Sequence, residues 1–83
     1  MNNWMEQKIK QDLPLGAHIR ALRIKRGLTQ EQMTARLQLH GCDLTRGSYA
    51  KIEAGIQHIS ASQLLAVADV LQTSIDALFG RSS

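Results

Sequence analysis

The sequence predicts an all-α domain of five helices joined by short connections. Three observations support this prediction. Apolar residues recur at helical spacing, hydroxyl residues stand where helices would begin, and glycines stand where they would end. Proline occurs once and aromatic residues make up only 4% of the chain, a composition that gives little support to a sheet. The 83 residues are enough for one domain with one modest core.

The first helix is expected to follow Pro14, because a helix does not need the N–H that proline lacks in its first turn. Leu15, Ile19 and Leu22 form one apolar stripe along this helix. Gly27 is the residue that ends it.

The leader before Pro14 is polar and permits two interpretations. Met5, Ile9 and Leu13 recur every four residues, which favours an extra N-terminal helix that docks or dimerises with Trp4 as its anchor. The alternative is a frayed tail. The predicted organisation is therefore a leader or accessory helix at 1–13, a helical domain at 14–80 and a C-terminal tail at 81–83.

Three further helix starts are visible as hydroxyl residues at fixed spacing. Thr29 and Ser60 each stand three residues before a glutamine, which predicts a capping box that opens the second and the fourth helix. Thr73 stands three residues before Asp76 and predicts a last short helix that ends near Gly80.

The third helix lies between Thr45, whose side chain can accept from free backbone N–H groups, and Gly55, which closes it. Its inward positions are expected to be Tyr49 and Ile52. Tyr49 is read as a core residue and not as a base-stacking residue, because of its spacing to Ile52.

The charge of the chain is unevenly distributed. Up to Gly55 it holds nine Lys or Arg against five Asp or Glu, and the overall formal charge is +3. This asymmetry is compatible with a polyanionic partner. A single cysteine, no signal-peptide core and no apolar run long enough for a membrane span make a cytoplasmic protein without membrane contact the expectation.

No arrangement of residues in the sequence indicates catalysis. His18, His40 and His58 share no motif spacing. His40, Cys42 and Asp43 stand close together in the sequence, which raises two hypotheses, a metal site and a redox-sensing thiol at Cys42. The paired Cys or His spacing of zinc sites is missing, which argues against the metal site. We therefore expect no enzyme activity, no metal and no cofactor.

Three stretches carry a family resemblance: "IRALRIKRGLTQEQMTARL", "SYAKIEAG" and "LLAVADVLQTSIDALF". Together they resemble the helix-turn-helix domain of the Cro/repressor (Xre-type, lambda-repressor-like) transcription regulators, from Leu15 to Phe79. Two features depart from that family. The stretch "QLHGCDL" between Leu37 and Thr45 is longer than the usual tight turn, and Thr34 stands where the family generally has alanine.

The resemblance implies that the helix beginning at Thr45 enters the major groove of DNA, with Thr45 itself among the DNA-binding residues. Arg46 would then donate to a guanine edge, Lys51 would reach a base or a phosphate, and Ser48 would donate to either. These three side chains are expected to share one exposed side. Gly47 either lets the helix backbone approach DNA closely or belongs to the preceding loop.

Other positions match further roles in the resembled family. Gln30 would anchor the phosphate backbone at the N-terminus of the second helix. Arg36 and His58 either border the duplex or are ordinary surface residues. Arg23 and Glu53 match a partly buried ion pair that braces the third helix against the first.

These features predict a sequence-specific regulator of transcription that binds double-stranded DNA, acts as a repressor and forms a homodimer. The alternative is a protein–protein interaction module, such as an antitoxin that masks a partner protein. A recognition face free of acidic residues favours the first interpretation.

Overall fold

The structure is a computed structural model that describes residues 8–9 and 14–81. It confirms the predicted all-α class, because these residues form five helices and only one pair of two-residue strands. In chain order the elements are β1 (Lys8–Ile9), α1 (Leu15–Lys25), α2 (Gln30–Leu39), α3 (Arg46–Glu53), β2 (Ile59–Ser60), α4 (Ala61–Leu71) and α5 (Ile75–Leu78).

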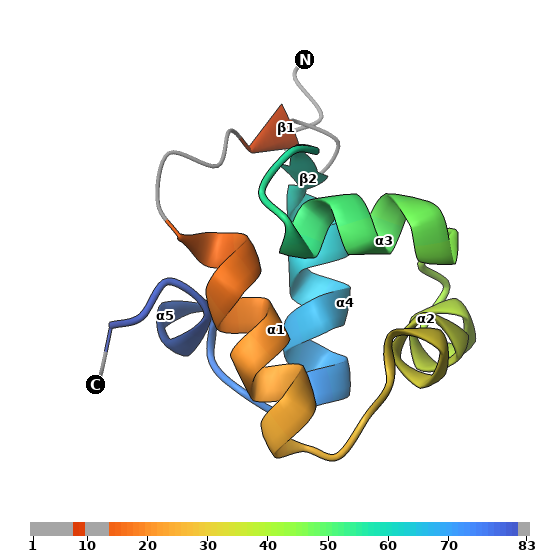
Figure 1. Cartoon of the computed structure of the whole chain (residues 1–83), viewed down its shortest axis with the longest axis horizontal. Coiled ribbons are helices and arrows are strands. Elements are labelled where there is room, and N and C mark those ends of the chain that lie inside the picture. Colours follow the sequence, from red (N-terminus) through yellow and green to blue (C-terminus); the bar gives the residue numbers. More distant parts are fainter. Residues whose placement is uncertain (1–7, 10–13, 82–83) are drawn as a thin grey trace.

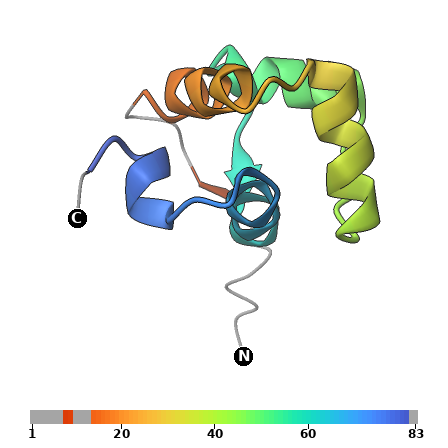
Figure 2. The ribbon, with the colours of Figure 1, turned by 90° about the horizontal axis from the view of Figure 1, so that it is seen from below.

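Helix α4 is the central element of the bundle (Figures 1 and 2). It packs against α1, α2 and α5, with α2 and α5 on opposite sides of it. Helix α3 lies across α1 and α2. This arrangement leaves one face of α3 without a neighbouring helix (Figure 1).

The core is built from the apolar stripes of all five helices, as the helical spacing predicts. Tyr49 is fully buried, so its assignment to the core is confirmed. The largest fully buried side chains are Leu15, Ile19, Met33, Leu37, Tyr49, Ile52, Ile59, Val67, Leu71 and Leu78.

Both predicted capping boxes are present. The Thr29 side chain accepts from the backbone N–H of Gln32, and the Gln32 side chain accepts from the backbone N–H of Thr29. Ser60 and Gln63 make the same pair of bonds at the start of α4. These reciprocal bonds satisfy backbone donors that a helix start leaves unpaired.

The predicted start of the last helix is wrong by one residue. Ser74, not Thr73, is the N-cap of α5, and its hydroxyl accepts from the backbone N–H of Ala77 at 3.1 Å. Helix α4 ends on Gln72 in the left-handed conformation, and the N–H of Thr73 turns back to the carbonyl of Ala68. Thr73 therefore belongs to the termination of α4, because its N–H completes that helix end.

Gly16, which no sequence motif singled out, sets the distance between α1 and α3. A Cβ atom at this position would lie 2.6 Å from the backbone carbonyl oxygen of Glu53 and would collide with that of Ile52. Only glycine therefore allows α1 to pack this closely against the end of α3.

The extra N-terminal helix predicted from Met5, Ile9 and Leu13 is wrong where the structure describes the leader. Lys8–Ile9 is a strand that pairs antiparallel with β2, with Ile9 opposite Ile59. A strand can pair with residues far away in the sequence, which a local spacing does not reveal. The other leader positions, Trp4 among them, lie outside the described residues.

Candidate nucleic-acid interface

Helix α3 begins at Arg46, with Thr45 as its N-cap. The Thr45 hydroxyl accepts from the backbone N–H of Ser48 at 3.1 Å, so Thr45 has the capping role that the sequence predicts. Gly47 is the second residue of the helix. The alternative in which Gly47 belongs to the loop is therefore wrong.

The outward face of α3 is broader than the prediction of one shared side. Arg46, Gly47 and Lys51 are exposed, whereas Ser48 is half-buried. At about 100° per residue, Arg46 and Lys51 lie about 140° apart around the helix, and Gly47 lies between them. Arg46 and Lys51 thus flank the exposed Gly47, and the half-buried Ser48 lies about 60° beyond Lys51.

The outward face of α3 carries cations but no acid. The only acidic residue within α3 is Glu53, which is buried. Arg46 and Lys51 therefore present their positive charges without a carboxylate on the same helix face. A surface of this kind attracts a polyanion such as nucleic acid and repels a basic partner.

The predicted ion pair between Arg23 and Glu53 is present and bidentate. Arg23 Nε donates to Glu53 Oε2 at 2.6 Å, and Nη2 donates to Oε1 at 3.1 Å. The third nitrogen, Nη1, donates to the backbone carbonyl of Leu28 at 2.7 Å. Since both side chains are buried, Arg23 fixes the end of α3 and the α1–α2 turn to each other.

Gln30, the predicted phosphate anchor, is the first residue of α2 and is half-buried. Its Nε2 atom donates to Glu53 Oε1 at 3.0 Å. The structure therefore brings Gln30 into contact with the ion pair, a connection that the sequence does not indicate.

The ion pair shifts the pKa values of both partners. Burial by itself raises the pKa of Glu53, but the hydrogen bonds to its carboxylate, led by that from Arg23, and the positive charge of Arg23 outweigh burial and hold that pKa below its ordinary value of 4.5. The hydrogen bond to Glu53 raises the pKa of Arg23. Burial also raises the pKa of the adjacent Tyr49 phenol, so this side chain stays neutral.

The lowered pKa of Glu53 predicts a pH-dependent contribution to stability. Because the folded-state pKa lies below the unfolded one, the contribution is complete above about pH 5 and is lost as the pH falls through the folded-state value. We expect the free energy of unfolding to fall more steeply on acidification for the wild type than for Glu53→Gln. Urea titrations from pH 7 to about pH 3 measure this. If the free energy of unfolding fell equally with pH in the wild type and in Glu53→Gln, the ionised carboxylate would not be stabilised in the folded protein.

Arg36 and His58 lie outside the group formed by α3 and Gln30. Arg36 is exposed in the last turn of α2, about 9 Å along the helix from Gln30. His58 is exposed in the segment between α3 and β2, at the opposite end of α3 from Arg46. Contact of either residue with DNA remains a prediction.

The long connection between α2 and α3 is partly helical. Helix α2 continues to Leu39, and Gly41 with positive φ ends it. Cys42 and Leu44 are buried, so the connection is anchored in the core before α3 begins. The additional residues therefore lengthen α2 and form an ordered link.

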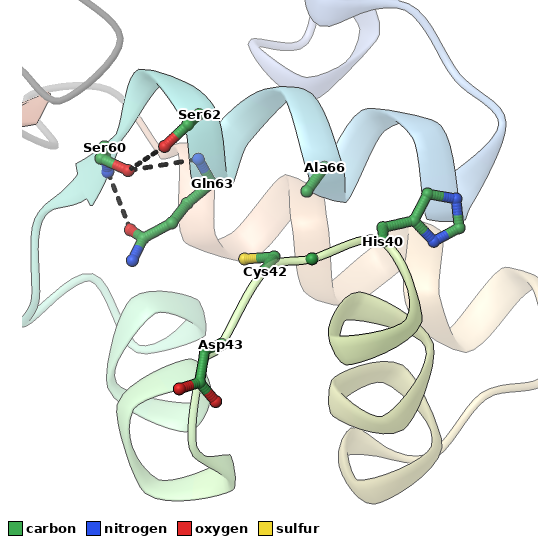
Figure 3. A pocket seen from close by; sticks show the side chains of 8 residues that line it. His40, Cys42, Asp43, Ser60, Ser62, Gln63 and Ala66 are labelled. Carbon is green, nitrogen blue, oxygen red and sulfur yellow. Dashed lines mark hydrogen bonds between the residues drawn. The ribbon is translucent and has the colours of Figure 1, made fainter.

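A polar hollow of about 340 Å³ lies where this connection passes beneath the start of α4 (Figure 3). Ser60, Ser62 and Gln63 line it on the α4 side, and Asp43 is directed away from them (Figure 3). Burial, with Asp43 adding to it, raises the pKa of the Cys42 thiol, which makes that thiol a weak nucleophile. This environment argues against the redox-sensing interpretation.

Within 8–9 and 14–81, no group of three or more His, Cys, Asp or Glu side chains is placed to bind a metal ion. In the same part of the chain, every helix is too short or too polar to span a bilayer.

The order of the helices, with α3 exposed after α2 and its connection, defines a helix-turn-helix protein of the lambda-repressor-like all-α class. A family model described as a helix-turn-helix domain matches residues 14–79. The chain belongs to this family of DNA-binding domains, in agreement with the resemblance to Cro/repressor regulators. Searches of curated proteins and of solved structures give no significant match.

Proposed function

We propose that this protein is a sequence-specific regulator that binds double-stranded DNA and represses transcription by occupying its site. The outward face of α3 carries this proposal, because it is exposed, cationic and free of acidic side chains. In helix-turn-helix proteins the second helix of the motif lies in the major groove. Here that helix is α3.

Arg46 and Lys51 supply the two charged contacts of this face. The guanidinium of Arg46 can donate two parallel hydrogen bonds to the O6 and N7 atoms of guanine. Lys51, one turn or more further along α3, can donate to a base acceptor or to a phosphate oxygen. Ser48, at the edge of the face, adds a hydroxyl that can donate to either.

Gly47 supports close approach of the α3 backbone to the bases. A Cβ at this position would meet no atom within 4 Å, so packing inside the protein does not require glycine here. Gly47 also has an ordinary negative φ, so the backbone conformation does not require it either. The absence of both reasons favours an external one, namely space for a ligand between Arg46 and Lys51.

Two such domains are needed for a site of useful length, because one α3 reaches few base pairs. We propose a homodimer on a pseudo-palindromic site, with half-sites about 34 Å apart. Selection of bound duplexes from a random pool tests preference, symmetry and spacing together. Recovery of unrelated sequences would refute sequence-specific binding.

The double substitution Arg46→Ala plus Lys51→Ala is expected to weaken duplex binding about 100-fold at fixed salt, since it removes one base contact and one further charged contact. The dependence of affinity on salt should also become less steep by about one counterion for each lost phosphate contact. Gel shifts over a salt series measure both quantities.

A charge-matched control is Lys25→Ala plus Arg81→Ala, which removes two exposed cations. Lys25 lies about 180° around α1 from Gly16, the residue that contacts α3, and Arg81 lies beyond α5. We expect this variant to retain most of the affinity. Equal losses in the two variants would indicate non-specific attraction only. A wild type that binds no duplex but co-purifies with another protein would instead support an interaction module.

A further inference from the structure

The Glu53 carboxylate connects three separate elements at one point. Its Oε2 atom accepts from Arg23 on α1, and its Oε1 atom accepts both from Arg23 and from Gln30 on α2. Glu53 itself is the last residue of α3. A single buried carboxylate therefore joins the core ion pair to a half-buried side chain at the start of α2.

The chemistry of the carboxylate fixes the orientation of the Gln30 carboxamide. An ionised carboxylate has only acceptor atoms, so it must face the Nε2 group of Gln30 and would repel its Oε1 atom. The lowered pKa of Glu53 keeps this carboxylate ionised. One N–H of Nε2 is used in this bond at 3.0 Å, and the second remains a donor.

We propose that Glu53 is a positioning residue for DNA binding: it holds the Gln30 carboxamide so that the second Nε2–H is ready to donate to a phosphate oxygen. This inference rests on the proposed function, in which the N-terminus of α2 lies against the DNA backbone. A held side chain loses less conformational freedom on binding than a mobile one. Glu53 thus contributes to affinity through Gln30, in addition to bracing α3.

The test separates positioning from bracing by replacing the whole ion pair. Arg23→Met plus Glu53→Met removes both charges together, and such apolar replacements of buried pairs are often neutral for stability. This variant should fold while leaving Gln30 without its acceptor. The side-chain amide resonances of Gln30 should then move toward those of a solvent-exposed glutamine, which a bracing role alone does not predict.

Duplex affinity is then measured with and without Gln30→Ala in both backgrounds, at a temperature where circular dichroism shows every variant folded. In the wild type, Gln30→Ala should weaken binding about tenfold, as for one hydrogen bond to a charged group. In the Met/Met background the same substitution should change affinity by less than about twofold. Leu78→Ala, at the buried last residue of α5, is the control for lost stability and should leave the affinity of the folded protein unchanged.

The possible results are distinct. The inference would be overturned if Gln30→Ala reduced duplex affinity equally in both backgrounds, or if the Gln30 amide resonances did not move. In either case, duplex binding by the wild type would still support the proposed function. Absence of any duplex binding by the wild type would overturn the proposed function and this inference with it.

Discussion

Glu53→Ala should lower the free energy of unfolding by about 3–5 kcal/mol, because it leaves the buried Arg23 guanidinium without its carboxylate. For a domain of this size such a loss corresponds to a fall in Tm of about 20 °C. The side chain of Glu53 is only 2% exposed, so water cannot replace the lost oxygen atoms without opening the packing between α1 and α3. Thermal and urea unfolding measure the effect.

The matched control for this prediction is the apolar pair Arg23→Met plus Glu53→Met. We expect it to recover most of the stability that Glu53→Ala loses, because neither charge is then buried alone. A Tm that is unchanged in Glu53→Ala would show that the two side chains behave as independent surface charges.

Gly16→Ala should lower the free energy of unfolding by about 2–3 kcal/mol, as expected when an added methyl group overpacks a fixed contact. The methyl group would meet the carbonyl oxygens of Ile52 and Glu53, which are backbone atoms and cannot rotate away. Helices α1 and α3 must therefore move apart, which also disturbs the bond between Arg23 and Glu53. Urea unfolding with circular dichroism detection measures the loss.

Gly47→Ala is the natural comparison, because it makes the same chemical change in a helix where the new Cβ meets no atom within 4 Å. There the gain in helix propensity, about 0.5–1 kcal/mol, should stabilise the protein. If both substitutions changed the free energy of unfolding in the same direction, the explanation for Gly16 would be contradicted.

The local signals in the sequence predicted the helices well. Thr29 and Ser60 were identified because a capping box needs only residues three apart, and Tyr49 because helical spacing fixes the buried stripe. The ion pair of Arg23 and Glu53 was available only through the family resemblance, since thirty residues separate the partners.

What the sequence did not reveal depends on contacts between distant segments. Gly16 matters because of the distance between two helix backbones, and the bond from Gln30 to Glu53 depends on how α2 meets the end of α3. Strand β1 was missed because its partner lies some fifty residues away, at Ile59–Ser60. Ser74 and not Thr73 is the cap of α5, because the backbone N–H of Thr73 bonds to the carbonyl of Ala68 and so completes the end of α4.

Gly47 also bears on how this domain should be engineered. Methods that raise thermal tolerance commonly replace exposed helix glycines by alanine, and the open space around Gly47 makes it an obvious target. Under the proposed function, the same methyl group would stand between the protein and the base edges. Folding stability would then favour alanine at position 47, whereas affinity for DNA would favour glycine. A library screened for heat resistance alone would therefore enrich variants with weakened DNA binding.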